Sequence, residues 1–285
     1  MKNHTSEVNE VRCAVGPFTT QCLLAGDESA PPVLLLHDGA WGGCGSVSWG
    51  GVIPRLAKRY RVIVPDMLGF GATDKAVFLD SSPYLFRARH VLALLDELGV
   101  TEKVQVAGNS FGGTIALRML EVCAERVSSA VTINGTGGPN WRSEFGKSEL
   151  AHWDGSRADL ERILDLLVDR TPHFDFDAQL DERLQSGMSY GHYRAMNAPS
   201  LPQPAIFNEG RTLNEDWPAP IAACAARILL VGGLRDPLLE TNWIDELSAR
   251  LHSPKSTWLD TKHSPNIDDP AAISELLDNW FSGGS

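Results

Sequence analysis

Gly108-Asn109-Ser110-Phe111-Gly112-Gly113 is the stretch of this 285-residue chain that decides its fold. It directly follows the apolar run KVQVA and directly precedes TIALRML, which predicts a strand before it and a helix after it. A G-x-S-x-G segment at such a turn is a nucleophile elbow, whose strained serine needs small neighbours two positions away. The helix would also direct its positive dipole end at the site. The stretch predicts Ser110 as a nucleophile; an incidental serine in a glycine-rich turn is the alternative.

Short apolar runs alternate with helical patterns along the chain, which is typical of an α/β fold with a mostly parallel sheet flanked by helices. The runs are apolar throughout, as in strands buried on both faces. Helical spacing is clearest over 86–98 and again after Pro270, where Asp268 and Asp269 mark a helix start. We expect strands at 33–36, 61–64, 104–107, 130–133, 228–231 and 257–259.

The segment 138–220 interrupts this alternation. It contains two helical patterns, at 158–169 and 177–184, and no convincing strand. We therefore expect residues 1–137 and 221–285 to form one α/β core, and residues 138–220 to form a helical lid over the strand ends.

A serine hydroxyl needs a neighbouring base before it becomes a good nucleophile. His263 lies just after the strand-like run STWLD and before the last helix, where the chain order Ser…Asp/Glu…His places the base. Asp236, in RILLVGGLRDPLL, is the matching acid, because its carboxylate can fix the imidazole tautomer. Glu240 lies nearby, on a helix expected after Pro237. A surface-loop histidine is the alternative for His263.

An oxyanion hole requires two backbone N–H groups near the nucleophile. One should belong to Phe111, the residue after Ser110. The other should come from the loop HDGAWGGCG (37–45), where glycines allow a close approach, and we expect Gly39. The same loop lacks the Lys-Ser/Thr ending of a P-loop and any G-x-G-x-x-G pattern in register, so nucleotide binding is not expected.

Composition argues against several classes of partner. The formal net charge is −11 and no Lys/Arg cluster is present, which argues against nucleic acid and anionic membranes. No apolar run approaches the roughly 20 residues that span a bilayer, and the first residues lack a signal-peptide core. The five cysteines show no CxxC spacing, which argues against a disulfide framework and a metal site. We expect a cytoplasmic protein.

Taken in this order, these residues resemble the α/β-hydrolase family from about residue 15 onward. More narrowly, WGGVIPRLAKRYRVIVPDMLGFGATDK (49–75) and VAGNSFGG (106–113) are similar to the meta-cleavage product hydrolases, which cleave a carbon–carbon bond in 2-hydroxy-6-oxo-dienoates from aromatic degradation. The resemblance implies a small-molecule substrate, no cofactor and, commonly, a homodimer. It also implies a lid arginine that holds the dienoate carboxylate. Arg183 matches it, although an exposed helix arginine is the alternative, and Asn109 and Trp41 are further expected substrate contacts.

Two features depart from that family's pattern. The loop HDGAWGGCG replaces the usual H-G-x-G-P-G and carries a bulky Trp41, and Ser264 follows His263 where many members have tryptophan. Two other functions therefore remain open: an ester or lactone hydrolase with the same triad, and a catalytically idle binding protein. Ser110 excludes haloalkane dehalogenases and epoxide hydrolases, which need an aspartate there.

Overall fold

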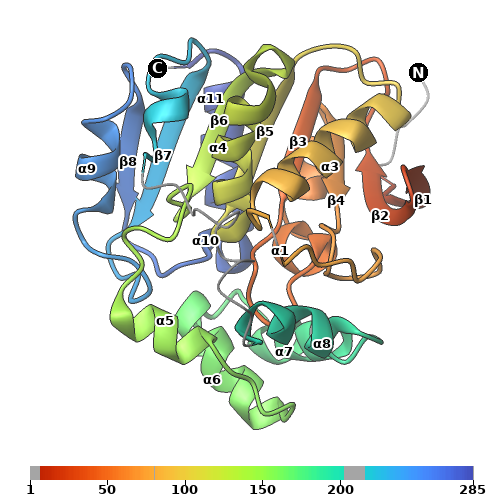
Figure 1. Cartoon of the computed structure of the whole chain (residues 1–285), viewed down its shortest axis with the longest axis vertical. Helices are drawn as coiled ribbons and strands as arrows, with labels where there is room; N and C mark the ends of the chain where they lie inside the picture. Colours follow the sequence, from red (N-terminus) through yellow and green to blue (C-terminus); the bar gives the residue numbers. More distant parts are fainter. Residues whose placement is uncertain (1–6, 80, 202–215, 285) are drawn as a thin grey trace.

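An eight-stranded sheet forms the centre of the computed structural model, which describes residues 7–79, 81–201 and 216–284 (Figure 1). The strand order is β1-β2-β4-β3-β5-β6-β7-β8. Strands β3 to β8 are parallel, and β2 is antiparallel to both of its neighbours. The strands are β1 (Asn9–Val15), β2 (Phe18–Ala25), β3 (Pro32–Leu36), β4 (Arg61–Pro65), β5 (Val104–Asn109), β6 (Val127–Ile133), β7 (Arg227–Gly233) and β8 (Lys255–Leu259).

The six strands expected from the sequence make up the parallel part of this sheet, and each observed strand contains its expected range. The α/β fold is therefore confirmed. The hairpin β1–β2 at the edge was not anticipated, because the exposed residues of β1 alternate with partly buried ones and give no apolar run. Its register is set by a tight turn at Gly16, which has a φ of 57°.

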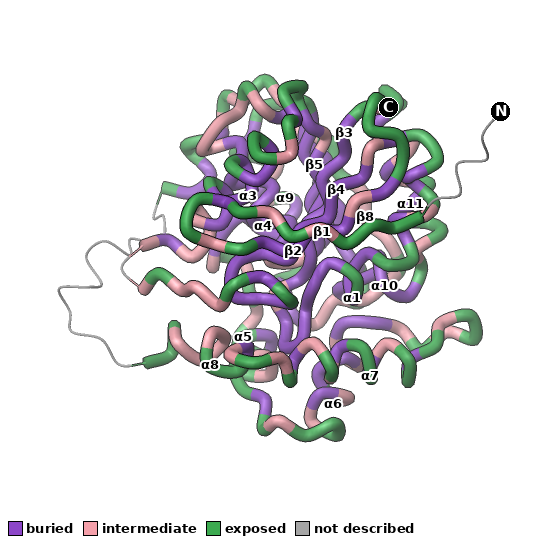
Figure 2. Tube along the Cα trace, turned by 90° about the vertical axis from the view of Figure 1, so that its right-hand side faces the viewer, coloured by how far each residue is buried: buried purple, intermediate pink, exposed green. Residues whose placement is uncertain are grey.

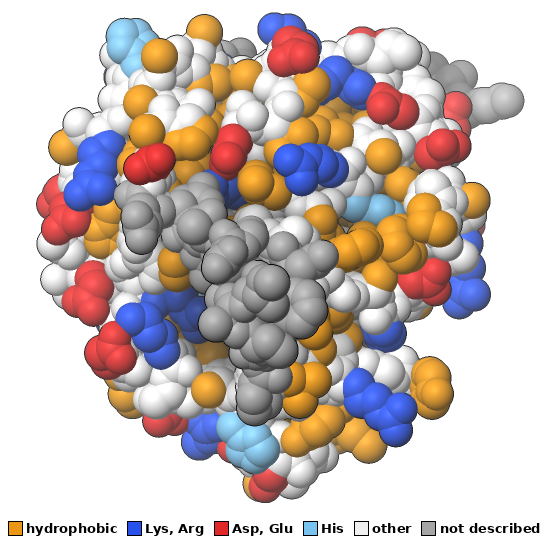
Figure 3. Space-filling model, viewed as in Figure 1, with side chains coloured by type: hydrophobic (Ala, Val, Ile, Leu, Met, Phe, Trp, Pro, Cys, Tyr) orange, Lys and Arg blue, Asp and Glu red, His pale blue; other side chains and the backbone are white. Residues whose placement is uncertain are grey.

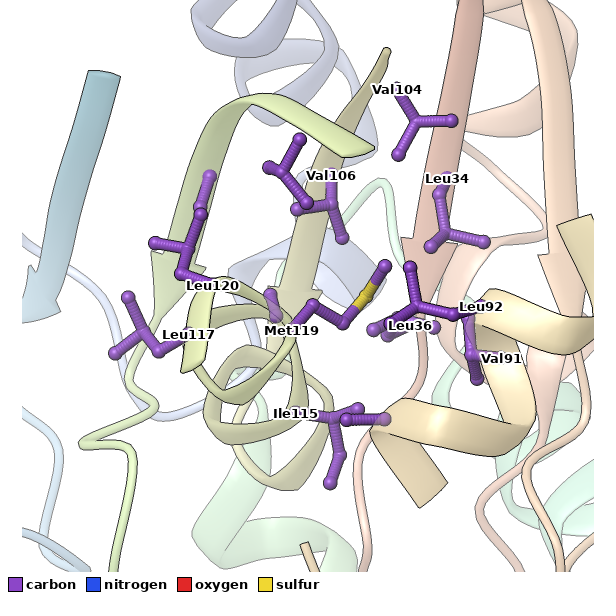
Figure 4. Close-up of a cluster of buried hydrophobic side chains, with 14 of the residues drawn as sticks. Leu34, Leu36, Val91, Leu92, Val104, Val106, Ile115, Leu117, Met119 and Leu120 are labelled. Carbon is purple, nitrogen blue, oxygen red and sulfur yellow. The ribbon is translucent and has the colours of Figure 1, made fainter. Parts of the chain in front are cut away.

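Helices cover both faces of the sheet. Successive residues of β3 point to opposite faces, so Leu34 and Leu36 join one core cluster and Val33 and Leu35 join the other. Figure 4 shows part of the first cluster, where side chains of α3 and α4 meet those of β3 and β5. The helices are α1 (Gly45–Trp49), α2 (Ile53–Leu56), α3 (Leu85–Glu97), α4 (Phe111–Cys123), α5 (Glu144–Leu150), α6 (Arg157–Leu167), α7 (Phe176–Gly187), α8 (His192–Asn197), α9 (Trp243–Ser248), α10 (Pro265–Asp268) and α11 (Pro270–Phe281), with short 3₁₀ turns at Ala124–Arg126, Ala198–Ser200 and Ala219–Ile221.

Helices α5 to α8 lie beyond the carboxyl ends of the parallel strands, at the bottom of Figure 1. They have a core cluster of their own, built around Leu160, Ile163 and Leu164 of α6, and this cluster also takes in Ala40 and Trp41 from the loop after β3. Other buried stretches follow the central strands, the loop after β3 and α4 (Figure 2). Residues 202–215 of the expected lid lie outside the described residues.

The surface carries charged side chains of both signs. On the face in Figure 3, basic and acidic side chains are interspersed rather than gathered by sign. All five cysteines are free. Within the described ranges, no helix has the length and apolar character needed to cross a membrane.

Candidate active site

Ser110 occupies the turn between β5 and α4 in a strained conformation, with φ 55° and ψ −116°. The glycines on either side allow this turn to form. A Cβ atom on Gly108 would lie 2.2 Å from the backbone of Gly112, and one on Gly112 would lie 2.1 Å from the Leu36 carbonyl oxygen. No side chain fits at either position, so the backbone has the nucleophile-elbow geometry that the sequence predicts.

The loops after β7 and β8 bring Asp236 and His263 together. His263 Nδ1 lies 2.6 Å from Asp236 Oδ2, and the two side chains are 2% and 3% exposed, aspartate first. The other carboxylate oxygen accepts the N–H of Leu238 at 2.8 Å, which fixes its orientation. Glu240 is exposed and does not lie on a helix, contrary to expectation, because α9 begins only at Trp243.

Ser110 and His263 line one cavity of about 310 Å³. Gly39 and Phe111 line it too, and they approach so closely that a Cβ on Gly39 would lie 2.7 Å from Phe111 Cβ. The two amides expected to form an oxyanion hole therefore belong to residues in contact beside the nucleophile. Apolar side chains line much of the rest of the cavity, among them Leu150, Leu167, Met196, Leu238 and Leu239.

His37 shapes the loop that carries Gly39. Its Nδ1 donates to the Asp38 carbonyl oxygen (2.6 Å), and its Nε2 accepts the Met67 N–H (2.9 Å). Complete burial lowers the pKa of His37, so the ring is neutral. A neutral ring with one N–H suits these two bonds, and it locks the loop to the strand end after β4.

Arg183, the residue expected to hold a substrate carboxylate, does not line the cavity and is paired with Asp38. Its Nη2 donates to Asp38 Oδ2 at 2.9 Å and its Nη1 to Asp38 Oδ1 at 3.1 Å, with both side chains 0% exposed. Burial raises the pKa of Asp38, but the Arg183 charge and hydrogen bonds from Arg183 and Ser48 outweigh it and hold that pKa well below its usual range. Asp38 takes the position of the first glycine in the H-G-x-G-P-G loop described above, and it forms the ion pair with Arg183.

Trp41 and Asn109, the other two expected substrate contacts, do not line the cavity. Trp41 is 2% exposed and donates from Nε1 to the Leu150 carbonyl oxygen (3.2 Å), so it joins the loop after β3 to α5. The Asn109 amide donates to the carbonyl oxygen of His263 (2.8 Å) and accepts from the Ser264 hydroxyl (2.9 Å). Asn109 therefore positions the segment that carries the base.

Several functional residues have no motif in the sequence to identify them. Asn134 lines the cavity and donates to the same His263 carbonyl oxygen at 2.9 Å. His192 of α8 accepts the Gly42 N–H at 3.1 Å, and burial lowers its pKa to about 4. Arg87 and Arg142 also line the cavity. Their spacing in the sequence suits ordinary surface residues, and only the folded chain brings them to the site.

Known proteins resemble this chain in sequence. A family model described as the alpha/beta hydrolase family matches residues 33–276. A 2-hydroxymuconate semialdehyde hydrolase from Pseudomonas sp. (strain CF600) is 28% identical over 242 residues, covering 82% of each chain. A 2-hydroxy-6-oxo-6-phenylhexa-2,4-dienoate hydrolase from Burkholderia cepacia is 38% identical over 107 residues, covering 37% of this chain and 36% of its own.

Solved structures resemble the whole chain. The 2-hydroxy-6-oxo-6-phenylhexa-2,4-dienoate hydrolase from Rhodococcus sp. strain RHA1 superposes with a TM-score of 0.85 at 23% identity, covering 98% of this chain and 100% of its own. A carboxylesterase from Bacillus subtilis has a TM-score of 0.79 at 16% identity, covering 98% and 93%. At these identities the likeness establishes the fold.

Proposed function

The chain belongs to the alpha/beta hydrolase family, and from that premise we propose that it hydrolyses a carbon–carbon bond in a 2-hydroxy-6-oxo-dienoate. The observation that carries the proposal is the similarity to a 2-hydroxymuconate semialdehyde hydrolase over 82% of the chain. The cavity supports it, because a nucleophile elbow and a carboxylate-bound histidine line one largely apolar space beside the two expected oxyanion amides.

Ser110, His263 and Asp236 divide the chemistry between them in this proposal. The dienol is first ketonised. His263, which donates through Nδ1 to Asp236, takes a proton at Nε2 from Ser110 or from a water. The resulting oxygen nucleophile adds to the C6 carbonyl, and the N–H groups of Gly39 and Phe111 stabilise the oxyanion. The C5–C6 bond then breaks, its electron pair forms a conjugated enolate, and His263 returns the proton to that enolate. When Ser110 is the nucleophile, the acyl group stays on Ser110, and a water deprotonated by His263 then hydrolyses this acyl-enzyme and releases the carboxylic acid.

Helices α5 to α8 are the proposed lid, within a lid segment 138–220 inserted between core segments 1–137 and 221–285. Leu150, Leu167 and Met196 support this role, since they come from that segment and line the same cavity as Ser110. A lid of this kind would exclude water from the reacting carbonyl. We also propose a cytoplasmic homodimer without metal or organic cofactor; light scattering of purified protein would test the dimer, and metal analysis the absence of metal.

An ester hydrolase with the same triad is the second candidate. One observation favours it: Asp38 forms an ion pair with Arg183, the arginine expected to bind a dienoate carboxylate. A neutral ester would need no such partner. The two candidates thus differ in whether the substrate is an anion.

Purified protein assayed with dienoates and with p-nitrophenyl esters separates these candidates. We expect kcat/KM for 2-hydroxymuconate semialdehyde or its 6-phenyl analogue to exceed that for any simple ester, measured as loss of dienolate absorbance. Product analysis should show one carboxylic acid and one hydroxypentadienoate in equal amounts. Rapid ester turnover with no dienoate cleavage would reject the carbon–carbon hydrolase and leave the esterase.

A further inference from the structure

The cavity is lined by a buried arginine that has no carboxylate partner in the described part of the chain. Three arginines are buried among residues 7–79, 81–201 and 216–284. Arg183 pairs with Asp38 and Arg118 pairs with Glu121. Arg87, 7% exposed, forms no ion pair with any acidic side chain in those ranges, and it lines the same cavity as Ser110. Its charge is buried and faces a space that a ligand can enter.

Two hydrogen bonds hold the Arg87 guanidinium in place. Its Nε donates to the Leu68 carbonyl oxygen (2.9 Å) and its Nη1 to the Pro83 carbonyl oxygen (2.8 Å). A guanidinium has five N–H donors. The remaining donors, including both on Nη2, have no acceptor among the described residues. The group is therefore fixed in direction yet only partly satisfied, which suits a binding role better than a structural one.

Aromatic rings place the guanidinium beside the reacting centre. Its central carbon lies 5.2 Å from the centre of the Phe111 ring and 5.6 Å from that of Phe70, and both rings line the cavity. Phe111 is also the residue directly after Ser110 and supplies one expected oxyanion amide. The Arg87 guanidinium therefore lies against the side chain of the residue next to Ser110.

The energetics favour an anionic ligand. Burial lowers the pKa of Arg87 to about 9, so the group is still charged at neutral pH. A buried charge without a counterion is strongly disfavoured, and an arriving carboxylate would relieve that cost.

We propose that Arg87, on the first turn of α3, receives the carboxylate of the substrate, in place of the lid arginine. The proposal rests on the proposed function for the identity of the substrate, but the preference for an anion can be measured without it. An arginine fork can hold a carboxylate through two charge-assisted hydrogen bonds. The charged end of the substrate then lies against the core, and the uncharged end lies among the leucines under α5 and α6.

Paired esters test this directly. Mono-p-nitrophenyl adipate carries a free carboxylate, and p-nitrophenyl hexanoate is a neutral ester of the same chain length. Arg87→Gln should lower kcat/KM for the anionic ester about 10- to 100-fold, the range for a lost charged hydrogen bond. It should lower that for the neutral ester less than about threefold, because a neutral ester offers nothing to hold. Arg89→Gln removes the same charge from an exposed position on the same helix and should change neither value.

Variants of two further arginines serve as controls. Arg183→Gln should reduce both esters by the same factor, since Arg183 acts only through Asp38. Arg142 also lines the cavity but is exposed, so water and salt screen its charge. If Arg183→Gln or Arg142→Gln discriminates between the esters and Arg87→Gln does not, the assignment is wrong. Equal loss on both esters in Arg87→Gln would also overturn it.

A second measurement covers the case in which Arg87→Gln folds poorly. Arg87→Lys keeps a charge without the fork, and its thermal unfolding should stay near that of the wild type. It should show an intermediate loss on the anionic ester alone. Calorimetry on Ser110→Ala protein should find tighter binding of adipate than of adipamide. If the protein prefers anionic esters but does not cleave dienoates, the proposed function is rejected and the role of Arg87 stands. If the protein cleaves dienoates and Arg87→Gln does not impair that cleavage, the proposed function stands and the role of Arg87 is rejected.

Discussion

Two buried carboxylates, Asp236 and Asp38, each follow the end of a parallel strand and each hold a nitrogen base, yet they serve different purposes. Asp236 lies 2.6 Å from His263, and Asp38 lies 2.9 Å from Arg183. All four side chains are at most 3% exposed. The difference is access: His263 also lines the cavity, whereas neither member of the Asp38 pair does.

This difference in access decides what each pair can do. A carboxylate that orients a base contributes to chemistry only if the base has a second nitrogen open to the substrate. The Arg183 guanidinium has no such opening, and its Nη1 also donates to the Trp41 carbonyl oxygen at 3.2 Å. The Asp38 pair therefore joins the oxyanion loop to α7. The same type of contact orients a cavity-lining histidine at one strand end and joins two elements of tertiary structure at another.

The largest effect on kcat is expected at Ser110, the proposed nucleophile for which the Asp236–His263 pair provides the base. Ser110→Ala should lower kcat by about 10⁴-fold or more, because triad members act as one unit. The free energy of unfolding should not fall, since alanine removes none of the contacts that hold the elbow. A fluorophosphonate probe should label the wild type and not the variant. Undiminished turnover in Ser110→Ala would remove Ser110 from the mechanism.

The Asp236 pair itself is expected to have the next largest effect. Asp236→Asn preserves the shape of the side chain but favours the wrong tautomer of His263, with a loss in kcat on the order of 10⁴. Glu240→Gln is the matched control, because Glu240 is exposed and lies a few residues further on. It should change kcat less than about twofold, since water and salt screen an exposed charge. A large loss in the control with a mild loss in Asp236→Asn would reverse the assignment.

Substitutions in the Asp38–Arg183 pair should mainly lower the free energy of unfolding. Asp38→Asn leaves the Arg183 charge buried without a counterion, which costs about 3–5 kcal/mol in free energy of unfolding. The double variant Asp38→Asn with Arg183→Met removes both charges and should recover part of that loss in urea denaturation. If the double variant is no more stable than Asp38→Asn alone, the two side chains are not coupled as the structure indicates.

The sequence predicted well where the three expected triad residues lie in the fold, for a physical reason. Parallel strands bring their carboxyl ends to one edge, so Ser110, Asp236 and His263 could be placed from strand order alone. Short-range sterics also fixed the elbow, because Gly108 and Gly112 have no room for a Cβ. These features depend on local sequence and on the rules of sheet topology.

The substrate side could not be predicted in the same way. The resemblance predicted Arg183 as a contact of the substrate carboxylate, but Asp38 gives this arginine a buried partner. Asn109 lies inside the elbow motif yet holds the His263 carbonyl oxygen from 154 positions away. Such contacts depend on tertiary packing, which no local spacing reports. Arg87 was missed for the same reason.

The smallest expected effect is a difference in pH dependence between the wild type and the Asp38→Asn, Arg183→Met double variant. The pKa of Asp38 is lowered in the folded protein, so as pH falls the unfolded chain takes up the proton first. The stability that this carboxylate contributes is therefore complete above its unfolded pKa of about 3.9 and decreases below it.

The expected loss follows from that unfolded pKa. Between about pH 5 and pH 3 the wild type should lose about 1 kcal/mol more than the double variant, in which position 38 does not titrate. Urea denaturation of both proteins across this range measures the difference, and carboxylates common to both cancel in it. If the free energies of unfolding of the two proteins change equally with pH, Asp38 has an ordinary pKa in the folded protein. Asp38 and Arg183 would then be no more strongly coupled than an exposed ion pair. If the wild type instead loses more stability than the double variant as the pH falls, Asp38 is charged in the folded protein. Its hydrogen bonds with Arg183 and Ser48 are the contacts that stabilise that charge.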